Sequence, residues 1–117
     1  MDEVVGRSWM VTDLSGEAVD ESRPPTLHFE EDGQVYGTGG VNRVRGTWTL
    51  AEGRLAFGPI VATLMAGPPE RMATERAVLG LLSAPLTVTV ADDELLLSAE
   101  DGRTARLVPA PPESELR

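Results

Sequence analysis

Few side chains in this sequence could make or break covalent bonds. The chain has no cysteine and a single histidine, His28, so thiolate nucleophiles, thiolate metal sites and multi-histidine metal sites are excluded. All 10 basic residues are arginines, which excludes a lysine Schiff base and a phosphate-binding lysine. No GxSxG elbow presents a serine nucleophile. We therefore expect a non-enzyme, with no cofactor and no metal site.

His28 is the one candidate for a general base. It lies in the alternating segment 26–30, on the face opposite Leu27 and Phe29. This placement predicts a surface or hydrogen-bonded histidine rather than a catalytic one. A hydrolase that uses His28 with a nearby carboxylate is kept only as a third, less favoured alternative.

Three acidic clusters, at 30–32, 92–94 and 100–101, resemble ligand sets for hard metals. They lie where hairpins must turn, and none has the full ligand spacing of a calcium loop. Turn chemistry is therefore the interpretation we prefer.

Three polar or glycine-rich features have structural interpretations as well. Gly37-Thr38-Gly39-Gly40 precedes no lysine and no helix, so it predicts a tight corner rather than a phosphate loop. Asn42, the only asparagine, can satisfy backbone groups with its side-chain amide. Glu75, next to Arg76, predicts an exposed salt bridge on a helix.

The elements that would position these residues are mostly strands. Alternating segments separated by turn residues predict antiparallel strands at 8–12, 26–30, 34–38, 47–50, 54–57, 86–90, 94–98 and 103–107. One segment, 68–82, has apolar residues at helical spacing, including Met72, Val78, Leu79 and Leu82, and ends before Pro85. The predicted fold is α+β and mostly β, a strongly curved antiparallel sheet or open barrel of about eight strands packed on one helix.

The predicted core consists of the apolar positions on the inward phase of each element. These are Trp9, Phe29, Trp48, Leu55, Phe57, Met72, Leu79, Leu82, Val88, Val90, Leu95 and Leu97.

Five motifs, in order and at matching spacing, resemble the META/HslJ domain family. They are Gly6-x-x-Trp9, Pro25-Thr26-Leu27-x-Phe29-x-x-Asp32-Gly33, Gly37-x-x-Gly40-Val41-Asn42-Arg43, Thr63-x-Met65-Ala66-Gly67 and Met72-x-x-Glu75. The resemblance covers 5–108, which implies one domain there. The segment 109–117 is Pro-rich and charged and has almost nothing to bury, so we expect a disordered tail. It implies structural roles for Trp9, Gly33, Gly40, Val41, Asn42, Thr63, Met65, Gly67, Met72 and Glu75.

The family resemblance also implies a function and a disulfide. Its members are heat-inducible, envelope-associated or secreted proteins without an established enzymatic activity. Many have cysteines where this chain has Val41 and Gly67, in positions thought to be bridged. The resemblance implies that these two residues face each other and that the chain is a cysteine-less variant, which argues against the oxidising location of many relatives.

Charge and composition limit the partners. The net charge of -9 disfavours nucleic acid, and no apolar run approaches the length of a membrane helix. The acidic N-terminus does not resemble a secretory signal, so we expect a cytoplasmic protein, or a secreted or envelope protein if a leader was removed. Arginine-only basic usage fits GC-rich codons and a high-GC bacterium.

The sequence as a whole predicts a monomeric, non-catalytic binding module, stress-related or envelope-associated, whose partner is an unknown protein or a small apolar ligand. The alternative is a small apolar-ligand carrier or a protein-binding inhibitor that uses the groove between sheet and helix.

Overall fold

The computed structural model of the chain describes residues 4–19 and 24–110. This part of the chain forms one helix, α1 (Pro69–Leu82), and antiparallel strands. The strands are β1 (Ser8–Leu14), β2 (Glu17–Ala18), β3 (Thr26–Phe29), β4 (Gln34–Thr38), β5 (Arg43–Ala51), β6 (Arg54–Phe57), β7 (Val61–Ala62), β8 (Leu86–Ala91), β9 (Glu94–Ala99) and β10 (Thr104–Pro109).

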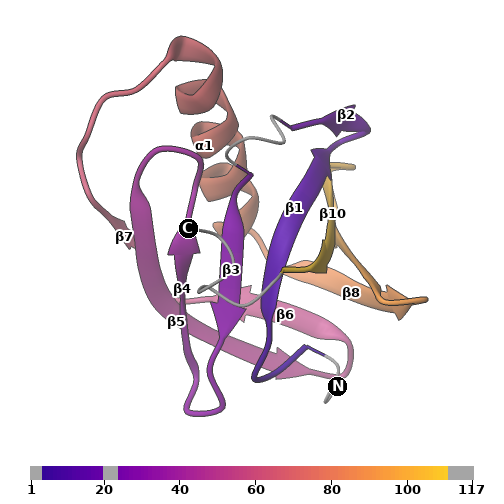
Figure 1. Cartoon of the computed structure of the whole chain (residues 1–117). Coiled ribbons are helices and arrows are strands. Elements are labelled where there is room, and N and C mark those ends of the chain that lie inside the picture. The colour runs from indigo at the N-terminus through magenta and orange to yellow at the C-terminus, as the bar shows by residue number, and fades with distance from the viewer. Residues whose placement is uncertain (1–3, 20–23, 111–117) are drawn as a thin grey trace.

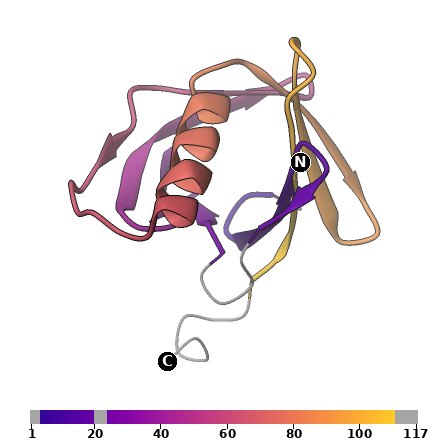
Figure 2. The same cartoon turned by 90° about the horizontal axis from the view of Figure 1, so that it is seen from above.

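Eight of the strands close into an antiparallel barrel, so the predicted mostly-β fold is confirmed. The order is β10-β9-β8-β6-β5-β4-β3-β1, and β10 pairs with β1 to complete the ring. The two short strands lie outside this path, β2 on β1 and β7 on β5. Figures 1 and 2 show α1 packed against the ring of strands.

Turn residues explain why the strands pair as hairpins. Asp92 and Asp93, between β8 and β9, both have positive φ, 51° and 64°, as a two-residue turn with the twist of a hairpin requires. Gly33, with φ of 92°, turns the chain from β3 into β4. The acidic clusters at these positions are therefore parts of turns, as predicted.

The corner after β4 requires glycines, because side chains at these positions would collide with their neighbours. A Cβ atom at Gly37 would lie 1.9 Å from the carbonyl oxygen of Thr26 on the neighbouring strand. At Gly39 it would lie 2.8 Å from Cγ of Glu75, and Gly40 has φ of 126°. The glycines let the chain turn tightly and let α1 approach it, which confirms the corner.

The helix has the predicted extent, but its inward stripe differs from the predicted one. The buried residues of α1 are Glu75, Val78, Leu81 and Leu82. Leu79 is only partly buried against the core, and Met72 is half-buried outside the core cluster. The apolar side chains of Val78, Leu81 and Leu82 join the barrel core.

Most of the predicted core is confirmed. Trp9, Phe29, Leu55, Leu82, Val88, Leu95 and Leu97 are buried, and Trp48, Phe57, Leu79 and Val90 pack partly buried against them. Met72 is the wrong prediction.

The two ends of the described chain meet beside β1. The indole Nε1 of Trp9 donates to the carbonyl oxygen of Val4, which is fully buried. Pro109, the first residue of the predicted tail, belongs to β10 and pairs with Trp9. Ala110 N–H donates to Ser8 O, while residues 111–117 lie outside the described part.

Candidate functional site

The two buried polar or charged side chains of the described chain, Asn42 and Glu75, contact each other. Asn42 lies in the corner between β4 and β5, and Glu75 lies on the inward stripe of α1. Oε2 of Glu75 accepts a hydrogen bond of 2.7 Å from Nδ2 of Asn42. Oε1 accepts from the backbone N–H groups of Val41, at 3.1 Å, and Asn42, at 2.5 Å. The carboxylate thus joins the helix to the barrel.

The predicted exposed salt bridge of Glu75 is therefore wrong. Position 75 is three residues from both Met72 and Val78, so it shares the inward face of the helix with them. Only 5% of Glu75 is exposed. A carboxylate at such a position needs hydrogen-bond donors, and Asn42 supplies two of the three.

Burial and hydrogen bonds act in opposite directions on the pKa of Glu75. Desolvation raises it, whereas the side chain and backbone N–H of Asn42 and the backbone N–H of Val41 lower it. The hydrogen bonds prevail, and the pKa lies below the ordinary value of 4.5. Glu75 is therefore ionised at neutral pH, which suits an acceptor rather than a proton donor.

The side-chain amide of Asn42 also holds the loop after β7. Its Oδ1 accepts from Met65 N–H at 2.6 Å, and its Nδ2 donates to Met65 O at 3.1 Å. These two bonds to one residue imitate the exchange between paired residues of an antiparallel ladder. Oδ1 also accepts from Thr63 Oγ1 at 2.9 Å. Asn42 therefore satisfies backbone groups, as predicted, and extends the pairing of β5 to residue 65.

Val41 and Gly67 face each other next to this network, as the family resemblance implied. A Cβ atom built on Gly67 would lie 3.5 Å from Cβ of Val41. This separation lies within the range of Cβ–Cβ distances found in disulfides, about 3.5 to 4.5 Å. Gly67 has no positive φ, so its backbone accepts a side chain.

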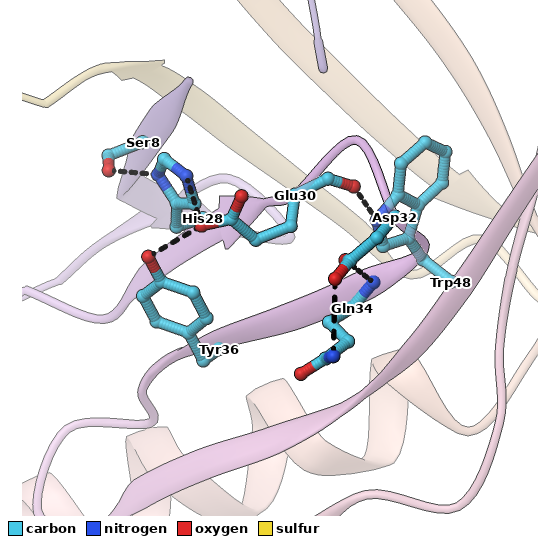
Figure 3. Close-up of polar contacts among 7 residues, drawn as sticks. All are labelled: Ser8, His28, Glu30, Asp32, Gln34, Tyr36 and Trp48. Carbon is cyan, nitrogen blue, oxygen red and sulfur yellow. Dashed lines mark hydrogen bonds and ion pairs between the residues drawn. The ribbon is translucent and has the colours of Figure 1, made fainter. Parts of the chain in front are cut away.

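His28 belongs to a different cluster, on the outer face of the barrel (Figure 3). Its Nδ1 lies 2.7 Å from Ser8 Oγ, and its Nε2 lies 3.3 Å from Oε1 of Glu30. Tyr36 stacks on the imidazole at 5.0 Å and donates to the same Oε1 at 3.0 Å. The histidine is thus hydrogen-bonded at the surface, as predicted.

The Ser8–His28–Glu30 arrangement matches a catalytic triad in composition but not in setting. Ser8 and His28 are paired residues of β1 and β3, so the serine lies on a regular strand rather than on an elbow. Neither hollow described below includes any of the three. The three side chains therefore form hydrogen bonds between neighbouring strands.

The remaining polar contacts in Figure 3 belong to the turn between β3 and β4. Oδ1 of Asp32 accepts from the backbone N–H of Gln34 at 3.1 Å. The carbonyl oxygen of Glu30 accepts from Nε1 of Trp48 at 3.0 Å. The first contact closes the turn, and the second joins the turn to β5.

Two hollows of the described chain are small. The groove between α1 and the strands β1 and β10 has a volume of about 100 Å³, and a hollow beside β6 and β8 has about 50 Å³. Sites for small molecules usually enclose roughly 300 to 1,000 Å³. In the described ranges, no group of three or more His, Asp or Glu side chains is arranged to hold a metal ion. No described helix is long and apolar enough to cross a bilayer.

Large apolar side chains are exposed on β4, on β7 and in the loop after β7. Tyr36 is 38% exposed, Val61 66%, Leu64 99% and Met65 64%. Tyr36 pairs with Arg45 across β4 and β5, and Arg45 pairs with Val61 across β5 and β7. Leu64 and Met65 follow in the loop that leaves β7 and returns to α1 (Figures 1 and 2). We call Tyr36, Arg43, Arg45, Val61, Leu64 and Met65 the β7 surface.

Comparison with known proteins establishes the family. The META domain model matches residues 2–112. The chain belongs to the META domain family. An NMR structure of a protein from Burkholderia xenovorans is similar to this META domain with a TM-score of 0.78 and 24% identity, covering 93% of this chain and 85% of that one. A crystal structure of a DUF4847 family protein from Bacteroides vulgatus has a TM-score of 0.65 and 13% identity, covering 90% and 93%. At these identities the two structures show a shared fold. No curated protein matches the chain.

Most of the family-motif residues of this META domain meet at one place. Gly40, Val41, Asn42, Thr63, Met65, Gly67 and Glu75 all lie in or against the Asn42–Glu75 network. Trp9 and Gly33 lie elsewhere, in the core and in a turn, and Met72 lies one turn of α1 before Glu75. Sequence reasoning missed the β7 surface, although the adjacent apolar residues Leu64 and Met65, outside any predicted strand or helix, were an available signal.

Proposed function

We propose that this META domain is a non-catalytic binding module whose binding site is the β7 surface. The supporting observation is the near-complete exposure of Leu64, at 99%, beside Met65 at 64% and Val61 at 66%. Contiguous exposed apolar side chains on a folded domain are a mark of interaction sites. Tyrosine, methionine and arginine, all present here, are enriched in protein–protein interfaces.

The Asn42–Glu75 network supports this role because it orders the loop before any partner arrives. Met65 is held through both its N–H and its C=O, and Thr63 through its hydroxyl and its N–H. Ordering loops and side chains opposes association, so a loop fixed in advance loses less entropy on binding. The network is therefore the support of the binding site rather than the site itself.

The alternative of an apolar-ligand carrier has less support. The groove between sheet and helix, where such a ligand would bind, has about 100 Å³. A stress-related or envelope-associated setting for the binding module is proposed from the family alone. Induction of the protein by heat in its own host would test that setting.

A photo-crosslinking residue at position 64 tests the proposed site. The matched control places the same residue at Thr89, an exposed position on β8. In the native host, we expect a discrete adduct with another protein from position 64 and none from position 89. Equal adducts from both positions, or none from position 64, would contradict the proposal.

A second measurement tests the absence of catalysis at Ser8 and His28. Any hydrolysis of activated esters by the purified protein should be unchanged in Ser8→Ala and in His28→Ala. A rate that falls to the uncatalysed background in both variants would instead establish a hydrolase.

A further inference from the structure

The loop after β7 continues the edge of the sheet. Thr63 N–H donates to Arg43 O, and Met65 N–H donates to Asn42 Oδ1, so both N–H groups point toward β5. In an antiparallel strand, successive residues point these groups in opposite directions. The backbone groups of Ala62 and Leu64 therefore point away from β5.

This outward edge is open. β7 pairs with β5 and with no other strand of the described chain. Both views show β7 at the margin of the fold (Figures 1 and 2). An unpaired edge offers its N–H and C=O groups to a strand from another chain.

The charge beside this edge is positive, although the whole chain carries -9. Arg45 pairs with Val61 of β7, and residues 33–51, which include Arg43 and Arg45, contain no Asp or Glu. Arg43 and Arg45 are exposed and form no ion pair with another described residue. A strand added beyond β7 would lie roughly 10 Å from β5, within reach of extended arginine side chains.

We propose that the edge formed by Ala62 and Leu64 receives an extended acidic segment of a partner protein as an additional antiparallel or parallel strand. Carboxylates of that segment would lie on the face of the sheet that carries Arg43, Arg45 and Val61, and its alternate, apolar residues would lie on the opposite face, beside Leu64. This inference rests on the proposed binding function and adds to it the chemistry and conformation of the partner. A second copy of this chain fits less well, because it would bring the same arginines together.

The test begins with random linear peptides displayed on phage and selected on the full-length protein. We expect the selected peptides to alternate Asp or Glu with apolar residues. Synthetic versions are then titrated by fluorescence anisotropy. Arg45→Glu should weaken their binding about tenfold or more, whereas the matched reversal Arg54→Glu, on β6, should leave it unchanged.

Methylated peptides test the added strand without altering the protein. N-methylation of the peptide residues that face β7 should abolish binding, and N-methylation of the alternate residues should be tolerated. If N-methylation at every peptide position left binding equally strong, the added strand would be refuted. Selected peptides that are basic, or whose binding is unchanged by Arg45→Glu, would refute the acidic partner. Binding of the protein to phosphatidylcholine–phosphatidylglycerol vesicles, with no peptide selected, would overturn the proposal in favour of a membrane.

These outcomes separate this inference from the proposed function. Crosslinking from position 64 together with failed peptide selection would refute the acidic strand and keep the binding module. Failure of both would refute both.

Discussion

Replacement of Glu75 by glutamine should destabilise the fold strongly, although the two side chains have nearly the same shape. The carboxylate accepts three hydrogen bonds, from Asn42 Nδ2 at 2.7 Å and from two backbone N–H groups. In Glu75→Gln, the amide nitrogen must face either Asn42 Nδ2 or those backbone donors. Both orientations oppose donors to donors, so at least one buried N–H loses its acceptor.

The expected loss in the free energy of unfolding is about 2 to 4 kcal/mol. A hydrogen bond to a charged group contributes about 1.5 to 3 kcal/mol, and an unsatisfied buried donor costs about 1 to 3 kcal/mol. The two effects overlap because they concern the same contact, so they are not simply summed. The matched control is Glu70→Gln in the exposed first turn of α1, which removes only a favourable helix-dipole interaction of about 0.3 to 1 kcal/mol.

Urea denaturation at neutral and acidic pH provides the measurement. The pKa of Glu75 is depressed in the folded protein, below its ordinary value of 4.5. Its contribution is therefore fully present above about pH 4.5 and is lost as the pH falls through the lower, folded value. The stability difference between the native protein and Glu75→Gln should narrow on acidification below pH 4.5.

A loss in Glu75→Gln no larger than that in Glu70→Gln would refute this reasoning. A stability difference that stays constant from neutral pH to pH 3 would refute the part that concerns ionisation.

Three further predictions concern the barrel and its corner. Val41→Cys with Gly67→Cys should oxidise spontaneously and raise stability by about 3 to 4 kcal/mol in thermal unfolding, and persistence of free thiols in air would contradict the facing geometry. Trp9→Ala should cost about 3 to 5 kcal/mol in urea denaturation and Trp48→Ala less, because Trp9 is fully buried and Trp48 partly; the reverse order would contradict the packing. Gly37→Ala should lower the melting temperature sharply, because its Cβ would overlap the β3 backbone, and an unchanged value would contradict the close approach.

The strands were largely predictable from the sequence, because their signals are local. Alternation in segments such as 26–30 and 86–90, with turn residues between, sets both the faces and the hairpins. The closure of the barrel could not be predicted from local signals. It depends on β10 pairing with β1 across most of the chain, and alternation alone is compatible with an open sheet as well.

The buried polar pair was only half predictable. Asn42 was expected to satisfy backbone groups because an asparagine after a glycine corner commonly does so. Its partner was not, because an acidic residue next to an arginine on a helix usually faces water. The spacing of three residues from Met72 and from Val78 placed Glu75 on the inward face of the helix. The hydrogen-bond donors that make burial of its carboxylate tolerable come from the corner after β4, whose approach to α1 is not visible in the sequence.

Amide hydrogen exchange, measured by NMR on the native protein, tests most directly whether the loop after β7 is held as an open edge. The N–H groups of Thr63 and Met65 have acceptors, Arg43 O and Asn42 Oδ1. Strand alternation places the N–H of Leu64 away from β5. We predict slow exchange at residues 63 and 65 and fast exchange at residue 64 between them. Uniformly fast exchange across 63–65, or protection of Leu64 equal to that of Met65, would contradict the account.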